Sequence, residues 1–165
     1  MQLYILFGVV GLLISGYLSW SIGNITLLIL YPIAWILLWT YSHSFKRTPL
    51  LGNVIVSLFC AFVPGVLLVS EWPAVNQLSN AETGTFGIIL LLIYILFAFL
   101  TTLIREIVKD IEDIDGDKKQ GCRTLPIVWG INWSKGVILL FSIMLLASLG
   151  SVSYTHLTLP TIYSV

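Results

Sequence analysis

The sequence predicts an all-α, polytopic membrane protein, a bundle of about five transmembrane helices. Composition is the first reason, because 58% of the 165 residues are hydrophobic and only 10% are charged. A soluble domain usually carries about a quarter charged residues. Hydropathy is the second reason, since long apolar runs alternate with short polar segments. The third reason is that most charged residues gather in two of those segments.

Each span is predicted from its length and from its lack of charge. A helix that crosses a bilayer needs about 20 apolar residues, so the second and fifth candidates are short. Pro32 and Pro64 lie inside spans, where neighbouring helices can satisfy the freed backbone groups. The five candidate spans are residues 3–22, 24–39, 51–70, 86–104 and 135–149.

The basic residues predict how the chain is oriented. All eight Lys and Arg residues lie in or beside the segments that follow the second and fourth spans. Two spans separate these segments, so both lie on one side, and the positive-inside rule makes loops 41–50 and 105–134 cytoplasmic. We expect an integral protein of a bacterial or archaeal cell membrane, with segment 71–84 outside. Acids are interleaved with the bases, which argues against nucleic acid as a partner.

The C-terminal segment differs in character from the rest. Residues 151–165 shift abruptly from Leu-rich to Ser-, Thr- and Tyr-rich sequence. Residues 152–161 match the translation of a transposase-type sequencing adapter, and a genuine polar tail is the alternative. We therefore treat residues 1–150 as the natural sequence and set 151–165 aside in reasoning about the fold.

The segment after the fourth span carries six of the eight acidic residues. Asp110, Asp113 and Asp117 follow a D-x-x-D-x-x-x-D spacing, which returns to one face of a helix, with Glu106 one turn earlier. Like charges on one face repel one another. A hard cation would offset this repulsion, and Mg²⁺ is typically held by one or two carboxylates plus substrate phosphates. The alternative is a solvated juxtamembrane helix of mixed charge.

Two flanking patterns accompany the aspartates. Gly121-Cys122-Arg123-Thr124-Leu125-Pro126 follows them, with a Gly suited to a tight turn and a Pro suited to the start of a helix. The segment after the second span runs from Tyr41 through Lys46 and Arg47 to Gly52-Asn53. A basic site on the same membrane face can close over the same diphosphate, although positive-inside anchoring alone also explains those two bases.

Together these patterns resemble the UbiA family of membrane prenyltransferases over about residues 3–150. The resemblance implies a fold of about nine transmembrane helices around a central cavity. On that fold the chain begins at the third helix and stops within the seventh. It lacks the family's first aspartate-rich motif, of N-D-x-x-D-x-x-x-D type. We therefore expect this chain by itself to be a catalytically inactive fragment.

The resemblance also implies a reaction and a set of roles. The enzyme would move a prenyl chain from a prenyl diphosphate to an acceptor, in contact with membrane lipid and with Mg²⁺ as cofactor. Asp110, Asp113 and Asp117 would bind the metal and, with Lys46, act in catalysis. The remaining implied residues bind diphosphate, namely Lys46, Arg47, Lys118 and Arg123, or substrate, namely Tyr41 and Asn53.

The acceptor is the least specified part of this prediction. Four residues separate Tyr41 from Lys46, a spacing closer to the branch that prenylates geranylgeranylglycerol phosphate for ether lipids. An aromatic acceptor of quinone or heme synthesis is the alternative within the family. A transporter or a non-catalytic membrane protein is the alternative of another class. It would more often carry ionisable residues within its spans, whereas the first four spans have none.

Overall fold

The computed structural model describes residues 2–43, 48–79 and 82–158, and within these ranges the chain is helical, with short turns and no strand. Five of the helices are long and three are short. In chain order they are α1 (Gln2–Ile22), α2 (Ile25–His43), α3 (Leu51–Ser70), α4 (Trp72–Ser79), α5 (Glu82–Glu112), α6 (Ile114–Lys119), α7 (Leu125–Val128) and α8 (Ile131–Thr158).

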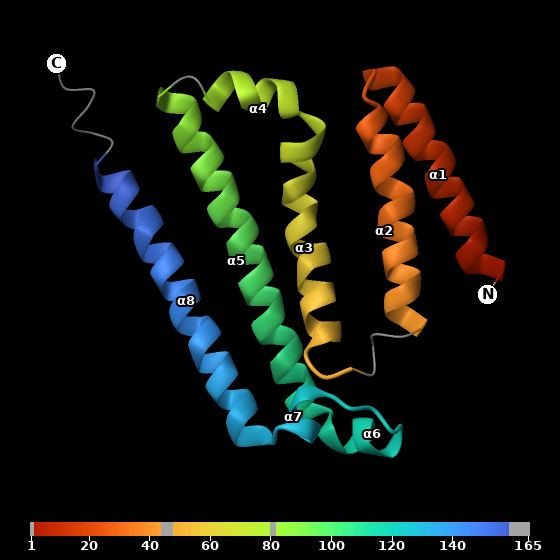
Figure 1. Ribbon diagram of the computed structural model, residues 1–165, viewed down its shortest axis with the longest axis vertical. Helices are drawn as coiled ribbons and strands as arrows, with labels where there is room; N and C mark the ends of the chain where they lie inside the picture. The colour runs from red at the N-terminus through yellow and green to blue at the C-terminus, as the bar shows by residue number, and fades with distance from the viewer. Residues whose placement is uncertain (1, 44–47, 80–81, 159–165) are drawn as a thin grey trace.

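The long helices α1, α2, α3, α5 and α8 run side by side in alternating directions (Figure 1). Four of them contain stretches long and apolar enough to cross a membrane: Ile5–Ile22, Leu51–Ser70, Gly84–Glu112 and Ile131–Ser153. The remaining long helix, α2, has a shorter apolar stretch, Leu28–Tyr41, as its predicted length suggested. The predicted all-α membrane bundle is confirmed.

Helices extend beyond the predicted spans at three places. The fourth span was predicted to end at residue 104, and the helix α5 continues past it to Glu112, with Ile107 on this extension completely buried. The predicted external loop 71–84 contains α4 and the start of α5. α4 lies across the end of the bundle where α3 finishes (Figure 1). α8 passes through residue 150 without interruption and ends at Thr158.

The best-packed part of the bundle lies at the end that carries α6 and α7 (Figure 1). Leu103 and Ile107 of α5 and Leu125 of α7 are at most 1% exposed and form one cluster. Partly buried residues of α3, α5 and α8 surround them. Burial of a large aliphatic side chain stabilises a water-soluble fold by about 1.5–3 kcal/mol. Inside a bilayer, tight packing takes over much of this role. The cluster therefore anchors the C-terminal half of α5, which carries Asp110, the first of the three predicted aspartates.

Small residues allow α3 to pack closely against α5, which is its most extensive helix contact. Gly52, Ser57 and Ala61 of α3 are all buried. Helices in membranes approach one another most closely where such small side chains form the contact. The close approach brings the first turn of α3 beside the last turns of α5.

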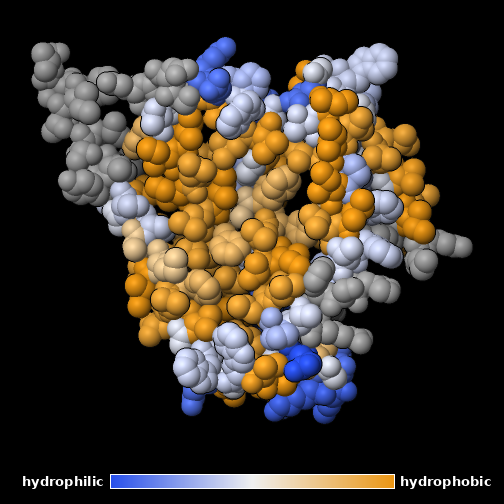
Figure 2. All heavy atoms as spheres, viewed as in Figure 1, coloured by the Kyte–Doolittle hydropathy of each residue, from blue (hydrophilic) through white to orange (hydrophobic). Residues whose placement is uncertain are grey.

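The surface is divided as a membrane protein requires. On the face in Figure 2, an apolar band separates two more polar ends. Exposed tryptophans lie toward both ends, with Trp20 and Trp72 at one and Trp129 and Trp133 at the other. Tryptophan is enriched at membrane–water interfaces, so the band between these residues fits the hydrocarbon layer.

Candidate functional site

The candidate site is a polar corner at the end of the bundle where α2 and α5 finish and α3 begins (Figure 1). Asp110 lies in the last turn of α5, and Asn53 lies in the first turn of α3. The Asn53 side-chain Nδ2 donates a hydrogen bond of 2.7 Å to Asp110 Oδ2, joining residues 57 positions apart in the sequence. One of the predicted substrate-binding residues therefore contacts one of the predicted metal ligands.

The start of α3 determines where Asn53 lies. Leu50 precedes the helix with φ of 60°, an uncommon conformation for a residue with a side chain. Its carbonyl accepts a 2.9 Å hydrogen bond from the Val54 amide, which closes the first turn. One turn further on, the Ser57 hydroxyl donates a 2.6 Å bond to the Asn53 carbonyl. Asn53 is thus held at a defined point of the corner.

Negative charge accumulates around Asp110. Its carboxylate is half-buried, and the charges of Asp117 and Glu106 repel it while Lys109 attracts it. Tyr41, at the end of α2, lies close enough for Glu106 and Asp110 to act on its hydroxyl electrostatically. Tyr41, Asn53 and Asp110 therefore converge from three different helices. A bound cation would relieve the repulsion among the carboxylates.

The three predicted aspartates do not lie on one continuous helix. α5 ends at Glu112, exposed Asp113 stands at the junction, and α6 carries Asp117. The junction is a slight break, because the Asp113 amide still bonds the Lys109 carbonyl and the Asp117 amide bonds the Asp113 carbonyl, each at 2.9 Å. In the part of the chain that the structure describes, no three His, Cys, Asp or Glu residues are grouped closely enough to hold a metal ion.

The donor set nevertheless suits a hard cation. Asp110 and Asp117 are half-buried and feel each other's charge. Mg²⁺ takes oxygen ligands, keeps several of its waters and needs only one or two carboxylates when phosphates supply the rest. These two carboxylates therefore fit magnesium bound together with a diphosphate.

A tight turn after α6 holds the aspartate segment in place. Gly121 has φ of +69°, which glycine adopts at little cost. The next amide, of Cys122, donates a 2.9 Å bond to the Asp117 carbonyl. Leu125 and Pro126 then enter α7 fully buried, with the Pro in its first turn. The predicted turn and helix start of this motif are confirmed.

The predicted basic residues fall into two groups. Lys118 and Arg123 are exposed, Lys118 next to Asp117 on α6 and Arg123 in the segment before α7. Lys46 and Arg47 lie outside the described residues. Their place in the sequence, between Tyr41 and Asn53, remains the basis for assigning them to diphosphate.

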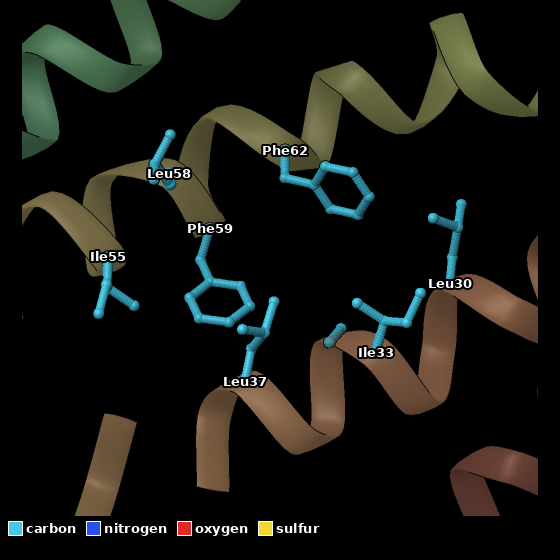
Figure 3. A pocket seen from close by; sticks show the side chains of 8 residues that line it. Leu30, Ile33, Leu37, Ile55, Leu58, Phe59 and Phe62 are labelled. Atoms are coloured by element: carbon cyan, nitrogen blue, oxygen red, sulfur yellow. The ribbon is translucent and has the colours of Figure 1, made fainter. Parts of the chain in front are cut away.

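An apolar cavity that the sequence did not predict lies between α2 and α3 (Figure 3). Its volume is about 320 Å³, and side chains from the two helices face one another across it. Leu37 lies one turn before Tyr41, and Ile55 lies two residues after Asn53, so the cavity begins near the polar corner. Its lining is Leu30, Ile33, Ala34, Leu37, Ile55, Leu58, Phe59 and Phe62.

Eight curated proteins that resemble this chain share the name digeranylgeranylglyceryl phosphate synthase. The relative from Thermococcus sibiricus is 35% identical over 74% of this chain and 43% of its own length. The relative from Haloquadratum walsbyi is 35% identical over 73% of this chain and 38% of its own. The relative from Methanopyrus kandleri is 39% identical over 67% of this chain and 35% of its own. The chain thus spans less than half the length of each of these relatives.

No solved structure gives a significant match to the chain. The comparison with protein families does, and it covers the polar corner, the aspartate segment and the apolar cavity together. It matches the UbiA prenyltransferase family over residues 1–165. The chain belongs to the UbiA prenyltransferase family.

Proposed function

We propose that the full-length protein containing this chain transfers a prenyl group from a prenyl diphosphate to geranylgeranylglycerol phosphate, with Mg²⁺ as cofactor. The observation that carries the proposal is the polar corner of Asp110, Asn53 and Tyr41 beside a wholly apolar cavity. A prenyl diphosphate has the same two parts, a charged head and a long apolar chain. The name shared by the curated relatives supports the choice of acceptor.

The head of the donor fits the polar corner. Asp110 and Asp117 would hold magnesium, which neutralises charge on the leaving diphosphate, and Asp113 lies between them in the sequence at the exposed helix junction. Lys118 and Arg123, together with Lys46 and Arg47, would hold the diphosphate oxygens. Tyr41 would contact the substrate where its chain joins the head. The proposal places this corner on the cytoplasmic side, because the basic segments border it.

The chain of the donor fits the cavity between α2 and α3. Its walls carry no polar side chain, so they exclude water from a carbon centre that becomes positively charged as the diphosphate leaves. The carbon–oxygen bond to diphosphate breaks, and diphosphate departs with the electron pair. The acceptor hydroxyl oxygen then bonds to that carbon and releases its proton.

The test is transfer by the full-length protein in membranes, with radiolabelled geranylgeranyl diphosphate as donor. Geranylgeranylglycerol phosphate and an aromatic acid are offered as acceptors in parallel. We expect a labelled ether lipid from the first, no product from the second, and loss of the product with EDTA. Product from the aromatic acid alone would favour the other family branch, and no product from either would favour a non-catalytic protein.

Aspartate variants test the site. Asp110→Asn and Asp117→Asn should each lower transfer by ~10²-fold or more. Each removes a carboxylate charge that would hold Mg²⁺ on the leaving diphosphate. Asp115→Asn is the matched control, since Asp115 is an exposed residue of α6 outside the D-x-x-D-x-x-x-D pattern. Equal transfer by Asp110→Asn and Asp115→Asn would refute the assignment.

A further inference from the structure

Asn53 and Asp110 form a side-chain pair between α3 and α5 that has a direction and a charge. The amide Nδ2 donates and the carboxylate Oδ2 accepts, at 2.7 Å. Resting on the proposed function, we infer that Asn53 is a positioning residue. It orients the Asp110 carboxylate toward a bound divalent cation instead of binding substrate itself.

The surroundings of Asn53 hold its side chain in place. Its own carbonyl accepts the Ser57 hydroxyl at 2.6 Å, and Ser57 is completely buried. Gly52 beside it is also buried, and Ala61 two turns beyond is 5% exposed. This small-residue face brings α3 close to α5. The short Asn side chain can therefore span the distance to Asp110.

Asp110 needs such a partner because the acidic residues near it repel its carboxylate and so oppose its pointing toward a cation that they would share. The charges of Glu106 and Asp117 repel its carboxylate. A neutral amide opposes this displacement without cancelling the charge, whereas a Lys or Arg in its place would neutralise the carboxylate that a cation requires. Only one lone pair of Oδ2 is used, so Oδ1 stays available for the cation. Partners of this kind fix ligating carboxylates in metal sites.

The test uses the purified full-length protein in detergent micelles, with Mn²⁺ as a paramagnetic probe and inorganic pyrophosphate present. Free and bound Mn²⁺ are separated by electron paramagnetic resonance. We expect Asn53→Ala to weaken Mn²⁺ binding by ~10–100-fold, the usual effect of removing an outer partner of a ligand. Asn76→Ala is the matched control, because Asn76 lies exposed on α4 at the opposite end of the bundle. It should bind Mn²⁺ as the unaltered full-length protein does.

A double-mutant cycle separates positioning from general destabilisation. If Asn53 acts through Asp110, adding Asn53→Ala to Asp110→Ala should weaken Mn²⁺ binding no further. Asn53→Leu removes the donor but keeps the number and branching of the side-chain heavy atoms, so it provides a second variant should the alanine variant unfold, as monitored by circular dichroism. It should show the same loss of affinity.

The outcomes distinguish the inference from the proposed function. Unchanged Mn²⁺ affinity in folded Asn53→Ala or Asn53→Leu would overturn the positioning role alone, as would additive losses in the cycle. Failure of the unaltered full-length protein to bind Mn²⁺ with pyrophosphate would instead remove the cation site of the proposed function, and the positioning role with it.

Discussion

The contact between α1 and α2 allows a quantitative prediction from a single added methyl group. A Cβ at Gly11 would lie 1.9 Å from the Tyr31 hydroxyl oxygen, where non-bonded heavy atoms prefer about 3.5–4.0 Å. The Tyr31 ring must therefore move, and its 3.1 Å hydrogen bond to the Gly8 carbonyl is lost. α2 carries Tyr41 at its end, so this contact also determines where one side of the candidate site lies.

The expected cost of Gly11→Ala follows from three terms. Overpacking a close contact costs about 1–3 kcal/mol, and losing the hydrogen bond costs about 0.5–1.5 kcal/mol. Replacing Gly by Ala inside a helix returns about 0.5–1 kcal/mol. The net effect is a loss of about 2 kcal/mol in the free energy of unfolding, by combining these ranges.

Gly16→Ala is the control, because it makes the same change in the same helix where there is room. Its Cβ would meet only Leu28 Cδ1, at 3.7 Å, an ordinary contact. This variant should gain up to about 1 kcal/mol from helix propensity. The assay is equilibrium unfolding in mixed micelles, followed by circular dichroism. Equal stability of the two variants would refute the described packing of α1 on α2.

Three further predictions concern the membrane and the substrate. Ala34→Trp should fill the cavity between α2 and α3 and raise KM for the prenyl diphosphate by about tenfold, equivalent to about 1.4 kcal/mol of lost binding. The control, Ala147→Trp on the exposed face of α8, should leave KM unchanged. Equal KM values for the two variants would show that the prenyl chain lies outside this cavity. A cysteine at exposed Asn76, in a chain whose two native cysteines are replaced, should react with an impermeant maleimide on intact cells. Labelling only after the membrane is opened would reverse the proposed orientation. Ala61 is 5% exposed, so the larger side chain of Ala61→Leu should overpack the contact and separate α3 from α5. This variant should therefore bind Mn²⁺ more weakly, as measured by paramagnetic resonance.

The fold was more predictable from sequence than the site was. Spans follow from local hydropathy, and all five are found as helices within the described residues, although the fifth, predicted short, lies in a 23-residue apolar stretch. The end of α5 was missed, because the aspartate spacing predicted one continuous helical face, whereas α5 ends at Glu112, before Asp113. α4 was also missed, although Pro73 after Trp72 suits a first helical turn. α4 was missed because the polar segment 71–84 between two apolar spans was interpreted as a loop.

Contacts between distant residues were beyond the reach of sequence patterns. Asn53 was predicted as a substrate-binding residue, but its bond to Asp110 joins positions 57 residues apart and depends on how closely α3 packs against α5. The cavity likewise depends on the spacing of α2 and α3 and on which side chains face one another (Figure 3). The local part of the aspartate motif was easier, because the turn at Gly121 and the entry of Pro126 into α7 are set by short-range chemistry.

The position of the polar corner at a helix end would let the proposed site serve both parts of an amphipathic prenyl diphosphate. A charged carboxylate deep in the hydrocarbon is costly, and a hydrocarbon chain in water is costly as well. α5 resolves both demands by being longer than the bilayer requires, at 31 residues against about 20. Its middle is apolar, and its last two turns carry Glu106 and Asp110. The buried contacts of Leu103 and Ile107 with Leu125 pack that extension against α7, and the hydrogen bond from Asn53 joins Asp110 to α3, one of the two helices that line the apolar cavity.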